Sequence, residues 1–330
     1  MKFIALCAQG LENIVVEEIK DQGDIENIEI YPGIVIFDFK DSIKKLLDVK
    51  TADDVLVFVK KFSDINRYKK SLWEIRKQLS SVNFKKNLFT VRKIRRTEQE
   101  TTFTINSSYK GRRDYTAREI TNSIKRIIIK NQDWDYKEKN AELYFHTILT
   151  NKISLLGLSL EKHPFHVLRR IKTIPGSLKS SVANAMIRLA EVSKKDIVLD
   201  PMCGSGMIAI EAGKITKNIL AGDIDKNSIK IAKENSKDIK FQVWDARKTK
   251  IKENSVDKII CNLPFDKQVK LEKDFLEEFI KEMRRVSKKY STWVFLTANP
   301  DDIKKFVDVE QELKMVNSGL KSNILIIKSQ

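Results

Sequence analysis

The feature that most constrains the fold is a strict alternation of short apolar runs and helix-like segments over the second half of the chain. Five apolar runs there predict strands at 197–200, 219–223, 240–243, 258–261 and 292–297. Such alternation is typical of a mostly parallel sheet with helices on both faces. Two further runs, 309–316 and 322–328, predict a terminal hairpin. We therefore expect an α/β fold whose C-terminal part is Rossmann-like, with a mostly parallel seven-stranded sheet.

A glycine-rich turn follows the first of these strands. The heptapeptide Asp200-Pro201-Met202-Cys203-Gly204-Ser205-Gly206 joins it to a helix expected to begin near residue 207. Gly204 and Gly206 allow positive backbone torsions and close approach of a ligand, and a helix N-terminus favours a ligand carboxylate. In such sheets, ligands bind outside the carboxyl ends of the strands. A purely structural tight turn is the alternative. The residues we expect at a cofactor site are Asp200, Pro201, Met202, Cys203, Gly204 and Gly206.

The next two strands also end in aspartates. Asp223, followed by Ile224, lies about twenty residues further on, where a carboxylate can accept both ribose hydroxyls of a nucleoside. Asp245, followed by Ala246, suits a hydrogen bond from an adenine amine. The alternatives are helix N-caps for Asp223 and Asp225 and a solvated surface position for Asp245. A nicotinamide site is less consistent with the sequence, because the three-glycine fingerprint is absent.

The fourth motif, Asn262-Leu263-Pro264-Phe265, follows the strand expected at 258–261. The Asn262 side-chain oxygen and the Leu263 carbonyl can accept both N–H groups of an amine, so that its lone pair points at an electrophile. Pro264 stiffens the loop, and Phe265 can stack on a base. A simple turn is the alternative. The four motifs together predict binding of S-adenosylmethionine and methylation of an exocyclic amine of a nucleobase.

On these motifs the chain resembles the THUMP-domain tRNA (guanine-N2-)-methyltransferases, in particular their archaeal-type acceptor-stem branch. The resemblance extends over nearly the whole chain and includes residues 175–179. It implies a class I methyltransferase domain, S-adenosyl-L-methionine as cofactor, and tRNA as partner, held at the acceptor stem and 3′ end. The residues it assigns to catalysis are Asn262, Leu263, Pro264 and Phe265.

The resemblance also suggests the target. The Asn-Leu-Pro-Phe form favours the N2 amine of guanosine six in the acceptor stem of tRNA. The alternatives are guanosine ten of tRNA, a guanosine of rRNA, an adenine N6 amine, or an idle RNA-binding protein of the same fold. Asp266 stands where the family usually has glycine. It can cap the following helix or accept the released proton.

The domain organisation expected from the resemblance has four parts. Residues 1–62 form an N-terminal ferredoxin-like α+β domain, 63–160 a THUMP RNA-binding domain, 161–178 a linker, and 179–330 the Rossmann-like methyltransferase domain. Periodicity predicts helices and strands in the first two parts. The predicted strands are 2–7, 33–39, 55–61, 88–94, 141–149 and 153–160, and the predicted helices are 11–20, 41–49, 72–79 and 115–130.

The charge of the chain points to a polyanionic partner. It has 62 Lys and Arg against 45 Asp and Glu, a formal net charge of +17. The usual partner of a protein with such a surplus is nucleic acid or an anionic membrane. A solvated charged face is the alternative for any single residue. The residues predicted to contact RNA are Arg92, Lys93, Arg95, Arg96, Lys110, Arg112, Arg113, Arg169, Arg170 and Lys172.

Other classes of protein fit the sequence poorly. Its three cysteines and three histidines lack metal-ligand spacing, so we expect neither a metal site nor disulfides. No apolar stretch approaches the roughly 20 residues of a spanning helix, and the N-terminus lacks the longer apolar region of a signal peptide. We therefore expect no membrane contact and a cytoplasmic protein, acting as a monomer.

Overall fold

The computed structural model of the chain describes residues 1–96, 101–162, 172–174, 176–264, 274–317 and 319–329. It divides into two compact units. The first comprises Met1–Cys7 and Val15–Leu168, and the second comprises Ala8–Ile14 and Arg169–Gln330. The expected boundary between residues 62 and 63 falls inside the first unit. The division into four parts stays a prediction.

The first unit is built on an eight-stranded sheet with the order β2-β3-β1-β4-β8-β7-β5-β6. Antiparallel pairing of β4 with β8 joins the strands of the expected ferredoxin-like part to those that follow. The strands are β1 (Lys2–Leu6), β2 (Ile25–Tyr31), β3 (Ile34–Phe39), β4 (Asp54–Lys61), β5 (Thr102–Tyr109), β6 (Asp135–Tyr136), β7 (Leu143–Leu149) and β8 (Ser154–Ser159). The helical segments of this part of the chain are α1 (Glu12–Gln22), the 3-10 helix η1 (Ile43–Asp48), α2 (Lys70–Leu79), α3 (Phe84–Arg92) and α4 (Ala117–Gln132).

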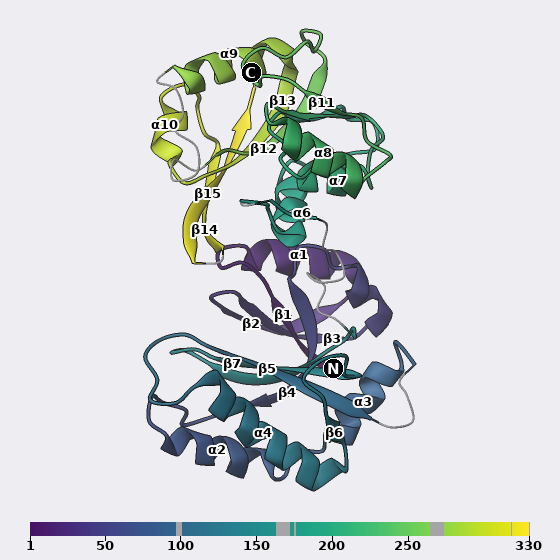
Figure 1. Ribbon diagram of the computed structural model, residues 1–330, viewed down its shortest axis with the longest axis vertical. Helices are drawn as coiled ribbons and strands as arrows, with labels where there is room; N and C mark the ends of the chain where they lie inside the picture. The colour runs from purple at the N-terminus through teal and green to yellow at the C-terminus, as the bar shows by residue number, and fades with distance from the viewer. Residues whose placement is uncertain (97–100, 163–171, 175, 265–273, 318, 330) are drawn as a thin grey trace. The chain divides into compact units, whose positions relative to one another are not determined.

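Helix α4 shows how the sequence positions a helix on this sheet. Thr116 and Glu119 form a capping box that satisfies the first turn, as is common at helix starts. Ile120, Ile124 and Ile128 recur at helical spacing, and all three are buried. The helix lies beside α2 and against β5 (Figure 1). The prediction of a helix at 115–130 is confirmed.

One prediction in this unit is wrong. Residues 88–94, expected as a strand, lie mostly in helix α3, which begins after the N-cap Asn83. Phe84, Leu88 and Val91 are buried at spacings of four and three residues, which is the period of a helix face. The strand of this region is β5, which begins only at Thr102.

The second unit contains a seven-stranded sheet with the order β11-β10-β9-β12-β13-β15-β14. Its strands are β9 (Val198–Asp200), β10 (Ile219–Asp223), β11 (Phe241–Val243), β12 (Val256–Asn262), β13 (Ser287–Thr297), β14 (Gln311–Asn317) and β15 (Leu320–Lys328). All pairs up to β13 are parallel, whereas β15 is antiparallel to both β13 and β14. The predicted mostly parallel α/β sheet is confirmed.

Helices cover both faces of this sheet (Figure 1). Along β12, Ile260 packs with helices α6 and α7, while Ile259 and Cys261 pack with α9 on the other face. This alternation follows the two-residue period of a strand. The helices are α6 (Ser180–Leu189), α7 (Met207–Ala212), α8 (Lys226–Asn235), α9 (Phe275–Val286) and α10 (Pro300–Lys304). Among the described residues, no helix combines the length and apolar character needed to cross a membrane.

Candidate active site

A cavity of about 460 Å³ opens in the second unit at the carboxyl ends of adjacent parallel strands. Strand β9 ends at Asp200, β10 at Asp223 and β12 at Asn262, and β9 lies between the other two. The order of the strands therefore brings these three polar residues to one edge of the sheet. The predicted site residues that line the cavity are Asp200, Met202, Cys203, Gly204, Asp223, Ile224, Asn262 and Pro264.

The glycine-rich turn has the backbone geometry that its sequence requires. Gly204 has φ +51° and Gly206 has φ +89°, both in the left-handed region that glycine accepts without strain. A Cβ atom on Gly206 would lie 2.9 Å from the Phe241 ring, so space as well as torsion excludes a side chain there. Gly206 lies just before α7 and does not line the cavity. The turn therefore brings main chain, without side-chain bulk, to the edge of the cavity.

Asp200 is the most buried polar residue of the cavity, with 1% of its surface exposed. Burial, and then the charge of Asp223, raise the pKa of Asp200 well above that of an ordinary aspartate. Its Oδ1 atom has no hydrogen-bond partner among the described residues. A buried acceptor without a donor is costly, and a cationic or N–H-bearing ligand group would satisfy it.

The raised pKa of Asp200 gives a pH-dependent prediction for the ligand-free protein. Between the ordinary carboxyl pKa and the raised one, the folded chain binds more protons than the unfolded chain, so stability falls as pH rises. Asp200→Asn removes this loss. We expect its melting temperature at pH 7 to exceed that of the unchanged protein by about 2–4 °C, the shift that roughly 1 kcal/mol produces. The difference should vanish near pH 4 in thermal melts, and an equal difference at every pH would contradict the assignment.

Asp223 and Asp225 have different roles. The Asp223 carboxylate accepts the Gly204 N–H at 2.8 Å and the Asp225 N–H at 3.0 Å, which fixes its direction at the cavity. Asp225 caps α8, because its side chain accepts N–H groups from the first turn of that helix. The capping alternative therefore describes Asp225 and not Asp223. Ile224 lines the cavity between them and is 66% exposed.

The end of β12 supplies a second buried acceptor without a partner. Asn262 Oδ1 is buried and has no hydrogen-bond partner among the described residues. Leu263 donates its N–H to Leu296 O at 2.9 Å, which pins the start of the loop, and its side chain is buried. Pro264 lines the cavity. Phe265 and Asp266 lie outside the described residues. Asp200 and Asn262 both line the cavity, and carboxylate and amide side chains there fit a polar ligand with N–H donors, such as S-adenosylmethionine or a nucleobase amine.

The remaining predicted cofactor residues do not line the cavity. Asp245 accepts hydrogen bonds from the backbone and side chain of Arg247 and keeps a lowered pKa because of that partner. Ala246 is buried in the core beneath α9. Pro201 accepts the Trp244 indole N–H at 2.9 Å. Ala246 and Pro201 thus contact the protein interior next to the cavity. The side chain of Asp245 is 32% exposed.

Two segments that the sequence did not assign to the site also line the cavity. The first is the turn before α6, where Ser177 accepts the Ile174 N–H and lies 3.0 Å from the Ser205 hydroxyl. The second is the start of α9, where Phe275 stacks on Phe279 with an interplanar angle of 5°. Family resemblance is the only sequence signal at residues 175–179. No sequence spacing distinguishes Phe275 from a core residue.

The residues predicted to contact RNA fall into two groups. Lys93 and Arg96 are exposed, whereas the guanidinium group of Arg95 donates to the backbone carbonyls of Glu142 and Leu160 and pairs with the Glu142 carboxylate. Those exposed in the first unit are Arg92, Lys93, Arg96, Lys110 and Arg112. Arg169 and Arg170 lie outside the described residues.

Arg113 and Lys172 also have protein partners. Arg113 donates to the carbonyls of Asn66 and Thr150, and Lys172 pairs with Glu234 at 2.7 Å. Both side chains therefore already contact polar groups of the protein. Within the described ranges, no group of three or more His, Cys, Asp or Glu side chains is placed to hold a metal ion.

Comparison with known proteins gives two domain matches. Residues 168–321 match the family described as RMKL-like, methyltransferase domain, and residues 2–56 match the RlmL ferredoxin-like domain. The crystal structure of TrmN from Thermus thermophilus superposes with a TM-score of 0.81 over 100% of this chain and 99% of that chain, at 20% identity. Both units of the chain therefore have the fold of a solved protein over their full length.

Curated relatives match parts of the chain. The U6 snRNA (guanine-N(2))-methyltransferase of Bos taurus is 32% identical over 55% of this chain and 37% of that protein. The tRNA (guanine(10)-N2)-dimethyltransferase of Methanothermobacter thermautotrophicus is 31% identical over 39% and 42%. The tRNA (guanine(6)-N2)-methyltransferase of Methanocaldococcus jannaschii is 23% identical over 57% and 62%. The chain thus spans less than two thirds of each of these relatives.

Proposed function

We propose that this chain methylates the N2 amine of a guanosine in tRNA, since residues 168–321 match an RMKL-like methyltransferase domain and the chain is related to the THUMP-type guanine-N2 methyltransferases that its motifs predicted. The observation that carries the proposal is that Asp200, Asp223 and Asn262, at the ends of β9, β10 and β12, line one cavity. S-adenosylmethionine is the cofactor of the methyltransferase domain. Guanosine six is the first candidate target.

On the cofactor side, each described residue has a distinct task. Asp200 would accept from the ammonium group of the methionine moiety, whose positive charge would offset the cost of a buried carboxylate. Asp223, already oriented by Gly204, accepts from the ribose hydroxyls. Ile224, exposed at the cavity, would pack against the adenine. A contact of Asp245 with the adenine amine stays a prediction, since Asp245 does not line the cavity.

On the target side, Asn262 and Leu263 orient the nitrogen that reacts. The lone pair of a guanine N2 amine is delocalised into the ring, which makes it a poor nucleophile. When Asn262 Oδ1 and the Leu263 carbonyl accept its two N–H groups, the lone pair is directed along one line, at a cofactor that presents a methyl group on a positively charged sulfur. On transfer, the nitrogen would gain the methyl group, the sulfur would keep the electron pair of the broken carbon–sulfur bond, and one amine proton would pass to water.

The target guanine has to leave its base pair to reach this cavity. An exocyclic amine in a stem is enclosed by the duplex, and extruding a base costs a few kcal/mol. Contacts of the exposed cations of the first unit with phosphates would offset part of that cost. The cations proposed for this role are Arg92, Lys93, Arg96, Lys110 and Arg112.

We expect the exposed cations and the paired arginine to differ in the salt dependence of RNA binding. Lys93→Ala with Arg96→Ala should weaken binding and reduce the slope of log K against log salt by about 0.7–0.9 for each phosphate that is no longer neutralised. Arg95→Met is the matched control, since Arg95 is held by Glu142. It should lower the melting temperature and leave the slope unchanged. If the double substitution leaves the slope unchanged, Lys93 and Arg96 do not contact the phosphates of the RNA.

The proposed function is tested with unmodified RNA. The protein is incubated with S-adenosylmethionine and a tRNA transcript, and mass spectrometry identifies the modified nucleoside and its fragment. N2-methylguanosine at position six is the expected product. Because relatives named for position ten and for U6 snRNA also match the chain, both RNAs belong in the same assay. Methylation only at position ten or in U6 would mean that guanosine six is not the target. No methylation of any RNA would favour an idle RNA-binding protein.

A further inference from the structure

The side chain of Asn235, the last residue of α8, joins two segments that are far apart in the sequence. Its Nδ2 atom donates to the carbonyl of Lys172 at 2.8 Å and to the carbonyl of Ser205 at 2.9 Å, and its Oδ1 atom accepts the Lys172 N–H at 2.8 Å. Ser205 belongs to the glycine-rich turn. Lys172 belongs to the connector, by which we mean the described residues 172–174 and 176–179 that precede α6. One amide group therefore bonds the connector to the turn.

The connector and the glycine-rich turn together line one side of the cavity. The hydroxyl of Ser177 accepts the Ile174 N–H at 2.8 Å and lies 3.0 Å from the hydroxyl of Ser205. A Cβ atom on Gly204 would lie 3.6 Å from Ile174 Cδ1, which is an ordinary van der Waals contact. All four residues line the cavity. We call Ile174, Ser177, Gly204 and Ser205 the connector wall.

The hydrogen bonds of Asn235 hold the connector more firmly than the neighbouring ion pair does. Lys172 also pairs with Glu234 at 2.7 Å, but the two side chains are 70% and 37% exposed. Exposed ion pairs contribute little because water competes for both charges. The Asn235 amide instead pairs with both backbone groups of Lys172, which fixes the position and the direction of that stretch of chain. Asn235 therefore sets where the connector lies on the turn.

The position of the connector wall relates it to one part of the cofactor. The glycine-rich turn leaves β9 directly after Asp200, and the connector contacts this turn at Gly204 and Ser205. Under the proposed function, Asp200 meets the methionine moiety and Asp223 meets the ribose. The methionine moiety has several rotatable bonds, and a preformed wall lowers the cost of ordering such a group. We therefore expect the wall to act on the methionine moiety more than on the nucleoside.

We propose that Asn235 is a positioning residue, which holds the connector on the glycine-rich turn and so preforms the wall that orders the methionine moiety of the cofactor. The inference rests on the proposed function, since that function places S-adenosylmethionine in the cavity. Asn235 does not itself line the cavity, so it acts through the connector. A hydrogen bond with a merely structural role would affect all ligands of the cavity equally. A positioning residue affects the ligand that reaches the wall.

The test compares two ligands by isothermal titration calorimetry on the full chain. They are S-adenosylhomocysteine and 5′-methylthioadenosine, the same nucleoside thioether without the amino-acid portion, with competition titrations for the weaker ligand. The unchanged protein should prefer S-adenosylhomocysteine by about tenfold or more, because this ligand adds an ionic contact with Asp200. In Asn235→Ala the affinity for S-adenosylhomocysteine should fall about tenfold and that for methylthioadenosine about twofold or less, so the preference falls about fivefold.

Asn235→Asp separates hydrogen bonding from packing. It keeps the size of the side chain and an oxygen that can accept the Lys172 N–H, but it lacks the Nδ2 donor to the carbonyls of Lys172 and Ser205. It should therefore lower the preference about as much as Asn235→Ala. Glu234→Gln is the matched control on the same helix turn, because it breaks the ion pair with Lys172 and leaves the bonds of Asn235. It should change the preference by less than about twofold.

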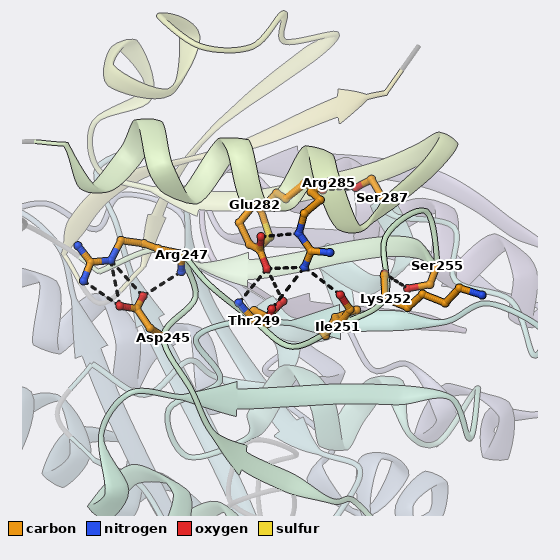
Figure 2. Close-up of polar contacts among 10 residues, drawn as sticks. Asp245, Arg247, Thr249, Ile251, Lys252, Ser255, Glu282, Arg285 and Ser287 are labelled. Atoms are coloured by element: carbon orange, nitrogen blue, oxygen red, sulfur yellow. Dashed lines mark hydrogen bonds and ion pairs between the residues drawn. The ribbon is translucent and has the colours of Figure 1, made fainter.

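A second control lowers stability at a place that does not line the cavity. Figure 2 shows Arg285 on α9, where it donates to Glu282 and to the carbonyl of Ile251. None of these three residues lines the cavity. Arg285→Met should therefore lower the melting temperature and leave the ligand preference unchanged. Thermal melts of every variant make this comparison possible.

The remaining outcomes count against the inference. Equal weakening of both ligands by the two Asn235 variants, or a preference that they leave unchanged, would overturn it and leave the proposed function standing. The same holds if the unchanged protein binds both ligands equally well. Failure of the unchanged protein to bind either ligand would overturn the inference and the proposed function together.

Discussion

Replacing Asn262 by alanine is expected to lower the rate of methyl transfer by about a hundredfold to a thousandfold, while the affinity for RNA stays within about twofold. The loss follows from the geometry of the reaction, because an amine held by one acceptor instead of two no longer directs its lone pair. Asn262 Oδ1 is buried and unpartnered among the described residues, so the substitution breaks no described hydrogen bond of this oxygen. Single-turnover assays with saturating cofactor and RNA measure the effect directly.

Asn262→Asp is the matched control for that experiment. Its carboxylate keeps an oxygen acceptor at the end of β12, so it should retain more activity than the alanine variant. Melting curves of both variants establish that the fold is intact. Transfer by Asn262→Ala at a rate within threefold of the unchanged protein would remove Asn262 from the reaction and leave the cavity as a cofactor site only.

The positions of the polar strand ends were predictable because two local signals agree there. Two apolar runs end at Asp200 and Asp223 and a third is followed directly by Asn262, and parallel strands place their carboxyl ends at one edge. Asp200, Asp223 and Asn262 therefore converge once the strand order is known. The positive backbone torsions of the first turn could also be predicted, because glycine adopts them without strain. The structure gives φ +89° at Gly206, where the Phe241 ring also leaves no space for a side chain.

The wrong and missed secondary-structure predictions lie where the local sequence does not distinguish a helix from a strand. Residues 88–94 contain β-branched and apolar residues that suit a strand, but the buried face of α3 begins four residues earlier, at Phe84. Strand β5 went unpredicted, although Phe103 and Ile105 alternate with threonines. Its polar partners Thr102 and Thr104 are buried as well, so this strand lacks the polar face on which an alternation argument depends.

The site residues that sequence analysis missed depend on tertiary packing alone. Phe275 reaches the cavity only because α9 packs over the segment that carries Arg247. The engagement of Arg95 by Glu142 is of the same kind, since the two residues are 47 positions apart. Sequence analysis can identify a basic cluster, but it cannot separate a cation used within the fold from one left for RNA.

Replacing Asp223 by alanine is expected to weaken binding of S-adenosylhomocysteine by about a hundredfold or more. Two ribose hydroxyls lose a charged acceptor, and hydrogen bonds to charged groups contribute roughly 1.5–3 kcal/mol each. The variant also removes the acceptor of the Gly204 N–H, which orients the glycine-rich turn. Calorimetry measures the binding loss, and filter binding of tRNA should show an affinity within about twofold of the unchanged protein.

Asp225 provides the comparison that makes this result specific. It lies two residues away and is also acidic, but its carboxylate is used as the N-cap of α8. Asp225→Ser keeps a capping oxygen, so its cofactor affinity should fall far less than that of Asp223→Ala. If both variants lose cofactor binding equally, the effect belongs to the charge of the region and not to a ribose contact. If Asp223→Ala binds the cofactor normally, the ribose lies elsewhere, and the cavity at the end of β10 has been assigned to the wrong ligand group.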